Sequence, residues 1–447
     1  MSWTQSGDHW RRPIDCHEIM FQSIAAAGQP LGREHWLMAG TLKLTFPSSM
    51  PDVEGKLRTA WSALRVRHPD IALELHPNEK QYLPISSAES LASWASSTFH
   101  VETIVASADE LFSKHLRVAS ASATCHWVPA SNELILVSSH WRWDGRGLLM
   151  MLHEFMNVLT ATELHQTDSV GTEACRLVPS IDEVMGLTKP LPDSLVQQAK
   201  DMLAPMEQGP PSIGLPIVPG GILGSTCRMQ AVIPGMITSA LRAACRTRHI
   251  PLTAALHASI VQETMAYHAL SGSTETEYKS WVAFDLRKYC PKPLDGIPHA
   301  PSLRLVALPL VVNATADWNL LVTSIQPTYQ QSFSPLESDL MSVRVPYVER
   351  ATAMLTTAPP TTEPNLSNLG IVDEYIQTQY GDFGVEKVWL AVQMLSPQLY
   401  VHTWGWKGEL FSSICYNEAF YEASFVEQWW RKVEQNLVSN LDLARSF

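Results

Sequence analysis

Hydrophobic and polar positions in the first half of the chain predict a mixture of strands and helices. Residues 38–46 alternate in polarity as a half-buried strand does, and residues 133–138 form a short apolar run rich in β-branched side chains. Apolar residues recur at helical spacing over residues 53–68. Residues 147–160 are almost continuously apolar and contain no proline, so they predict a second helix.

The second half of the chain continues this mixture. Helices are expected over residues 236–247, 254–268 and 418–437, with Thr253 as the N-cap of the middle one. Strands are expected over residues 280–284, 303–312, 388–394, 400–406 and 410–416. Strands both alternate with helices and cluster, so the predicted fold class is α+β, or mixed α/β, with a mixed sheet flanked by helices in each half.

Two segments rich in proline and glycine interrupt the pattern. In the first, residues 190–224, neither a helix nor a central strand is expected, because proline fixes φ and removes an N–H donor. The second, residues 358–364, predicts a loop. The expected organisation is therefore a domain of residues 1–190, a crossover of residues 191–224 and a domain of residues 225–447.

The composition is that of a globular protein. The chain has 447 residues, of which 45% are hydrophobic and 17% charged, so it can bury a large core. The formal net charge is −12, and no run of lysine or arginine offers the basic surface that phosphate binding needs. These features argue against nucleic acid as a partner.

Cysteine usage and the N-terminus bear on the cellular compartment. The seven cysteines are widely spaced without a CxxC pair, which indicates neither a zinc site nor a disulfide framework and suits the cytosol. The N-terminus is polar, and no apolar stretch reaches the length of a membrane span. We expect a cytoplasmic protein without a membrane partner.

The main candidate for chemistry is a histidine at the end of a predicted strand. His140 follows the apolar run of residues 133–138, and Asp144 and Gly145 lie just before the next predicted helix. A histidine with an ordinary pKa is mostly neutral at cellular pH, as a general base must be. The alternative is that His140 is an ordinary core histidine. Asp144 either orients His140 or holds the turn by pairing with an arginine, and we favour the second.

Other catalytic patterns find little support. The sequence contains no GxSxG, Walker A or GxGxxG motif, and His153-Glu154 lacks the second histidine of a zinc protease. Cys125 and His126 would point to opposite faces of a strand. His402 is interpreted as a core or pocket-wall residue. No metal site is predicted.

The segment from His140 to Gly145 resembles the HxxxDG signature of the acyl-CoA-dependent acyltransferase superfamily. This superfamily includes plant BAHD enzymes, nonribosomal condensation domains and chloramphenicol acetyltransferase. Four further segments resemble family elements in the same order along nearly the whole chain. They are residues 10–18, similar to the opening of fungal trichothecene O-acetyltransferase-like enzymes; 285–287, an "LR" element; 367–370, an "SNxG" element; and 381–384, part of the BAHD "DFGWG" motif.

The resemblance implies two chloramphenicol-acetyltransferase-like domains with the histidine in a tunnel between them. His140 would take the proton from the acceptor as it attacks the thioester of acyl-CoA. Asp144 would point away and pair with Arg287, so that Asp144, Gly145 and Arg287 are structural members of the motif. No bound cofactor or metal is implied, because acyl-CoA is a co-substrate, and a monomer is expected. The candidates for the substrate or CoA pocket are Trp141, Trp143, Ser367, Asn368, Gly370, Asp382, Gly384 and His402.

The sequence departs from the family pattern at three places. The Trp-Gly end of "DFGWG" is missing after Gly384, and Ser139 stands where condensation domains have a first histidine. Trp141, Arg142 and Trp143 are bulkier than the usual residues of the motif. They either reshape the tunnel or pack behind the loop, and we favour packing.

The predicted function is acyl-CoA-dependent O-acyl transfer, with acetyl transfer to a hydroxyl group of a fungal-type secondary metabolite as the specific form. The many aromatic residues favour an apolar alcohol as acceptor, and amine acceptors stay open. Two alternatives come from other classes of protein. The fold could serve a pericyclase-like cyclisation or isomerisation of a polyketide-type substrate, for which the Trp-Arg-Trp segment is the hint. The chain could also be a non-catalytic binding module.

Overall fold

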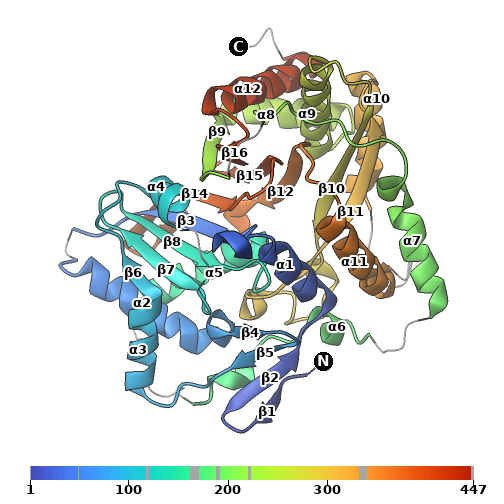
Figure 1. The fold of residues 1–447 in the computed structure, drawn as a ribbon. Helices are drawn as coiled ribbons and strands as arrows, with labels where there is room; N and C mark the ends of the chain where they lie inside the picture. The colour runs from blue at the N-terminus through green and yellow to red at the C-terminus, as the bar shows by residue number, and fades with distance from the viewer. Residues whose placement is uncertain are drawn as a thin grey trace. The chain divides into compact units, whose positions relative to one another are not determined.

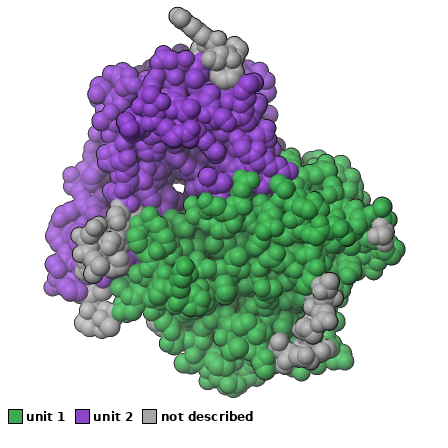
Figure 2. Space-filling model, turned by 180° about the vertical axis from the view of Figure 1, so that it is seen from behind, with its two compact units in different colours: residues 1–191, 285–305, 373–393 green, residues 192–284, 306–372, 394–447 purple. Residues whose placement is uncertain are grey.

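The computed structural model describes residues 2–48, 50–116, 120–161, 171–187, 192–219, 223–331 and 340–443. The chain forms two compact units, which Figure 2 distinguishes by colour. Unit 1 comprises residues 1–191, 285–305 and 373–393, and unit 2 comprises residues 192–284, 306–372 and 394–447. The first break falls where the crossover is expected to begin, but two later segments of the expected second domain join unit 1. Residues 191 and 220–222 of the predicted crossover lie outside the described residues.

Unit 1 is built on a six-stranded sheet in the order β13-β14-β3-β8-β7-β6 (Figure 1). Its strands are β3 (Met38–Thr45), β6 (Phe99–Val101), β7 (Thr124–Val128), β8 (Glu133–Ser138), β13 (Gln379–Tyr380) and β14 (Phe383–Val392). Neighbouring strands are antiparallel except for β6 and β7, which are parallel, so the sheet is mixed. β8 lies in its interior and is buried along its whole length, which explains its continuous apolar run.

Helices and a second, smaller sheet complete unit 1. The helices are α1 (Cys16–Ala26), α2 (Val53–Arg67), α3 (Ala88–Thr98), α4 (Ala108–Glu110), α5 (Gly145–Thr160) and α6 (Ile181–Val184). The smaller sheet contains β1 (Thr4–Ser6), β2 (His9–Pro13), β5 (Glu79–Tyr82) and β4 (Glu74–His76), in that order. Helix α5 packs against β3 and α2. A Cβ at Gly40 of β3 would lie 2.8 Å from Cγ of Leu148, so glycine lets the helix approach the strand closely.

Unit 2 contains a four-stranded sheet in the order β12-β15-β16-β9, together with the strand pair β10-β11. The strands are β9 (Thr226–Ile233), β10 (Glu277–Asp285), β11 (Leu305–Asn313), β12 (Asn365–Ile371), β15 (Tyr400–Trp406) and β16 (Glu409–Asn417). β12 pairs with β15 in parallel, whereas β15 pairs with β16, and β16 with β9, in antiparallel orientation. This sheet is therefore also mixed, and the predicted α+β, or mixed α/β, class is confirmed.

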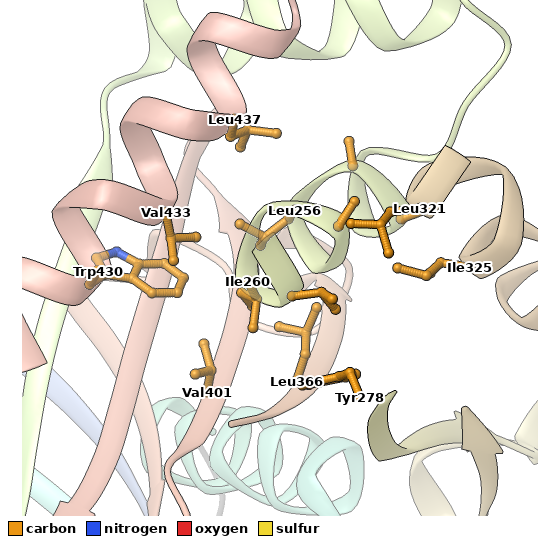
Figure 3. Close-up of a cluster of buried hydrophobic side chains, with 14 of the residues drawn as sticks. Leu256, Ile260, Tyr278, Leu321, Ile325, Leu366, Val401, Trp430, Val433 and Leu437 are labelled. Carbon is orange, nitrogen blue, oxygen red and sulfur yellow. The ribbon is translucent and has the colours of Figure 1, made fainter. Parts of the chain in front are cut away.

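The hydrophobic core of unit 2 surrounds one buried helix (Figure 3). The helices of this unit are α7 (Asp193–Glu207), α8 (Gly235–Thr247), α9 (Leu252–Ala269), α10 (Trp318–Tyr329), α11 (Leu340–Thr357) and α12 (Ala423–Asn440). Residues 254–261 of α9 are all buried, because α10 and α12 both pack against this helix. Leu256 and Ile260 lie in one cluster with Val433 of α12 and Leu321 of α10.

Helix α7 corrects the prediction that the crossover would contain no helix. Residues 193–204 contain no proline, and the helix ends at Glu207, two residues after Pro205. Leu195, Ala199 and Leu203 share one buried face, and α7 packs against α11. Burial against a distant helix, which composition does not reveal, stabilises this segment.

Several element boundaries also differ from the pattern. Helix α9 begins at Leu252, and Pro251 rather than Thr253 occupies the N-cap position. β14 begins at Phe383, before the expected position, and α12 begins at Ala423, after it. No helix among the described ranges combines the length and the apolar character that crossing a membrane requires.

Candidate active site

The HxxxDG segment is the connection between β8 and α5 in unit 1. β8 ends at Ser138, and α5 begins at Gly145. Asp144 is the N-cap of α5, and its Oδ1 accepts a hydrogen bond of 2.8 Å from the N–H of Gly147. This cap explains why the helix begins two residues earlier than the apolar pattern predicts.

Asp144 is held by groups on a later segment of the chain. Nη1 of Arg287 lies 2.9 Å from both carboxylate oxygens, and the N–H of Arg304 donates to Oδ2 at 2.8 Å. Asp285 also accepts from Nη1 of Arg287, at 3.0 Å. Burial disfavours the Asp144 carboxylate, but Arg287 and the N–H donors outweigh this and hold its pKa below the ordinary value. The structure thus contains the Asp144–Arg287 pair that the resemblance implies.

His140 lies among aromatic rings rather than charged groups. The ring of Phe21 is stacked on the imidazole, with centroids 3.8 Å apart and planes 5° apart, and the ring of Trp36 lies 6.3 Å away. Nδ1 of His140 is buried, and no described residue forms a hydrogen bond with it. Burial lowers the pKa of His140 to about 4, against the opposing effects of its own backbone and Asp144. The imidazole is therefore neutral near pH 7.

The sequence pattern alone does not reveal the two rings beside His140. Phe21 belongs to α1, and Trp36 lies just before β3 with φ of 62°, which is unusual for a bulky residue. The N–H of Trp36 donates to the carbonyl of Gln393 at 2.8 Å. Only the resemblance of residues 10–18 to a family segment pointed toward this part of the chain.

The bulky residues between His140 and Asp144 are buried. Trp141 and Trp143 have exposed fractions of 6% and 0%. Arg142 is also buried and donates to Oγ of Ser138 at 2.6 Å and to the carbonyl of Leu73 at 2.7 Å. These contacts support packing behind the loop.

Four of the predicted pocket residues lie in the sheet of unit 2. Ser367 is paired with His402 across β12 and β15, and the ring of Tyr400 lies 4.9 Å from that of His402. Oδ1 of Asn368 accepts a hydrogen bond of 2.8 Å from the N–H of Gly370, whose φ is 78°. The "SNxG" element thus forms a bulge at which the register of β12 shifts.

The two remaining pocket candidates do not lie near His140. Asp382 is exposed at the turn between β13 and β14, and Gly384 is paired with Thr45. The opposite end of β3, Met38, is paired with Ser138, from which the chain continues to His140. Because β3 separates these ends by about 20 Å, Asp382 and Gly384 lie at the other end of the sheet.

One group of potential metal ligands has a structural explanation. Ligand atoms of Asp15, Cys16 and His17 lie within 4.8 Å of one another and are buried. Oδ1 of Asp15, however, accepts hydrogen bonds of 3.0 Å from the N–H groups of His17 and Glu18 at the start of α1. The carboxylate therefore caps a helix.

We expect Gly147→Ala to destabilise the protein by about 1–3 kcal/mol, the range typical of overpacking. A Cβ at this position would lie 2.5 Å from the carbonyl oxygen of Ala300 and 3.1 Å from Nη2 of Arg287. Urea denaturation measures the loss in the free energy of unfolding. Gly235→Ala is the matched control at a helix start, since its Cβ would meet no atom closer than 3.6 Å. Equal effects of the two substitutions would contradict the steric argument.

Comparisons with known proteins agree with this fold. No known family model matches the chain. The acetyltransferase pigO of Monascus ruber is 28% identical over 94% of both chains, and the O-acetyltransferase pigM of the same fungus is 26% identical over 99% of this chain and 88% of its own.

Two solved structures share the fold. The TRI3 trichothecene 15-O-acetyltransferase of Fusarium sporotrichioides superposes with a TM-score of 0.82 at 16% identity, over 98% of this chain and 96% of its own. A variant of the starter condensation domain of rhizomide synthetase RzmA, in complex with C8-CoA, gives a TM-score of 0.64 at 11% identity, over 96% of this chain and 94% of its own. The resemblance to acyltransferases that the sequence indicated is confirmed by these relatives and by the shared fold. The prediction of an acyltransferase enzyme is likewise confirmed.

Proposed function

We propose that the protein transfers an acetyl group from acetyl-CoA to a hydroxyl group of a small molecule, with His140 as the general base. The observation that carries this proposal is a neutral imidazole at the end of β8 that forms no hydrogen bond with Asp144, whose carboxylate is occupied by Arg287 and Arg304. The full-length relatives pigO and pigM support acetyl as the transferred group. The C8-CoA bound to RzmA supports CoA as the carrier of the acyl group.

The chemistry follows from the state of the imidazole. Nε2 of His140 takes the proton of the acceptor hydroxyl while its oxygen attacks the thioester carbonyl. The tetrahedral intermediate then collapses, the C–S bond breaks, and the departing sulfur takes the proton back from the imidazolium. Since burial lowers the pKa of His140 to about 4, its protonated form is a strong acid for this second step. The Asp144–Arg287 pair holds the loop and exchanges no proton.

The proposed acceptor is an apolar fungal metabolite with a free hydroxyl group. The TRI3 enzyme is named as a trichothecene 15-O-acetyltransferase, so it transfers an acetyl group to an oxygen of a small molecule. This likeness supports O-transfer to a small molecule here. The aromatic rings of Phe21 and Trp36 beside His140 suit an apolar acceptor.

A coupled assay tests transfer directly. Purified protein is incubated with acetyl-CoA and hydroxylated compounds from a fungal extract, and thiol release is measured together with product mass. We expect the release of free CoA to depend on the acceptor. We also expect a product that carries one added acetyl group. Conversion of a compound in the absence of any acyl-CoA would contradict transfer and favour cyclisation. Binding without conversion in either condition would favour the non-catalytic module.

The pH dependence of the reaction should reflect the lowered pKa of His140. A base acts when it is unprotonated, so kcat/KM should fall only as the pH drops through about 4 and should be nearly constant between about pH 6 and 8. Initial rates with acetyl-CoA across this range, in buffers of constant ionic strength, provide the measurement. An acidic limb centred near the ordinary histidine pKa of about 6.5 would show that His140 is not held neutral by burial.

A further inference from the structure

The stacking of Phe21 on His140 is close enough to fix the orientation of the imidazole. Their centroids are 3.8 Å apart and their planes differ by only 5°, so one whole face of the imidazole is covered by an apolar ring. Phe21 has an exposed fraction of 4% and cannot move aside without repacking its surroundings. Trp36 lies 6.2 Å from Phe21 and completes a group of three rings.

The helix that carries Phe21 is fixed at its start by buried charges. Asp15 and Glu18 form a capping box at the N-terminus of α1. Both oxygens of Glu18 accept from Arg12, at 2.7 and 3.0 Å, and Lys80 forms a second ion pair with the same carboxylate. Burial disfavours the charged Glu18, but the two cations outweigh it and lower its pKa to about 2.

Lys80 of this charged network also contacts Trp141, the residue after His140. Nζ of Lys80 donates to the carbonyl of Trp141 at 3.1 Å and lies 5.0 Å from the centre of the Trp141 ring. Glu18 is therefore connected to α1 through its capping box and, through Lys80, to the residue that follows His140. The family-like segment of residues 10–18 supplies Arg12 and Glu18 of this network.

We propose that Phe21 is a positioning residue for His140, held in place by the buried Arg12–Glu18–Lys80 network, and that its ring fixes the plane of the imidazole and keeps water from one face. The inference rests on the proposed role of His140 as base. It gives a role to an N-terminal segment that is distant from the motif in sequence and lies beside His140. Phe21 itself touches no reacting atom in this scheme.

A histidine titration followed by NMR tests the inference without requiring activity. The protein is labelled with ¹³C-histidine, and the His140 signal among the 16 histidines is assigned with His140→Ala. In the wild type, His140 should stay neutral between about pH 5 and 8. In Phe21→Leu, water reaches the exposed face, and the protonation constant should rise by about tenfold or more. Asp144 is the one charged group that acts on His140 in the described part of the chain, and it is unchanged in this variant.

Two companion variants separate positioning from general loss of packing. Phe112→Leu removes an equally buried ring that contacts Trp389 instead of His140, and it should leave the His140 titration unchanged. Phe21→Tyr keeps the stacked ring and should restore the wild-type titration. If Phe21→Leu does not fold, Phe21→Met replaces it, because the flexible thioether side chain fills an irregular space more readily. The same variants are assayed for acetyl transfer, where Phe21→Leu should lower kcat by about tenfold and change KM little.

The outcomes are distinguishable. The positioning role would be overturned if Phe21→Leu or Phe21→Met folds and its His140 titrates as in the wild type. An equal shift in Phe112→Leu would do the same. A shifted titration in an enzyme that never releases CoA would support the positioning role while contradicting the proposed function.

Discussion

The His140→Ala variant should lower kcat for acetyl transfer by about 10²–10⁴-fold while the protein remains folded. This is the range expected when a positioned general base is removed, because the acceptor hydroxyl must then lose its proton to water. Folding should be preserved because Nδ1 of His140 has no hydrogen-bond partner among the described residues, and the side chain contributes mainly its contacts with Phe21 and Trp36. CoA release with a fixed acceptor gives the rate, and circular dichroism reports the fold.

A second histidine provides the matched control for this variant. His153 lies on α5, in the same unit, and is hydrogen-bonded to Tyr380 at 2.7 Å and to Asn157 at 2.9 Å. His153→Ala should therefore lose some stability but retain transfer within about threefold, since no reacting group is removed. A folded His140→Ala protein as active as the wild type would exclude His140 from the mechanism.

Removing one partner of the Asp144–Arg287 pair should have the largest effect on stability. Arg287→Met leaves a buried carboxylate without its cation, and Asp144→Asn leaves a buried guanidinium with a weakened partner. We expect each to lower the free energy of unfolding by about 3–5 kcal/mol and to reduce the yield of folded protein. Urea denaturation at constant pH measures the change, and the activity per folded molecule should fall much less than the yield.

An exposed ion pair and a double variant make this prediction specific. Arg431 and Glu427 form a pair on the exposed side of α12, and Arg431→Met should cost no more than about 0.5 kcal/mol. The combined Asp144→Asn and Arg287→Met variant should be less destabilised than the sum of the single variants, because no unpaired charge remains. A stable, well-folded Asp144→Asn protein without activity would contradict the structural role and assign Asp144 to the chemistry.

Local hydrophobic patterns were sufficient to predict the bounds of some strands. The strand over residues 133–138 has the predicted bounds because its apolar run is buried throughout the interior of a sheet. The strand over residues 400–406 likewise matches β15. Helix α7 was missed because the nearby prolines dominate the composition, whereas the burial of Leu203 against the rest of unit 2 decides the conformation.

The amino-acid sequence by itself indicated the α+β, or mixed α/β, class, the His140 motif and the resemblance to acyltransferases. It left open whether Asp144 orients His140 or holds the turn, because the deciding partner, Arg287, lies 143 residues away. It also made Asp382 and Gly384 candidates for the substrate or CoA pocket, whereas the strand register puts them at the far end of β3 from His140. Only the tertiary structure brings Phe21 onto the imidazole, because stacking and burial depend on contacts between distant segments that no local spacing encodes.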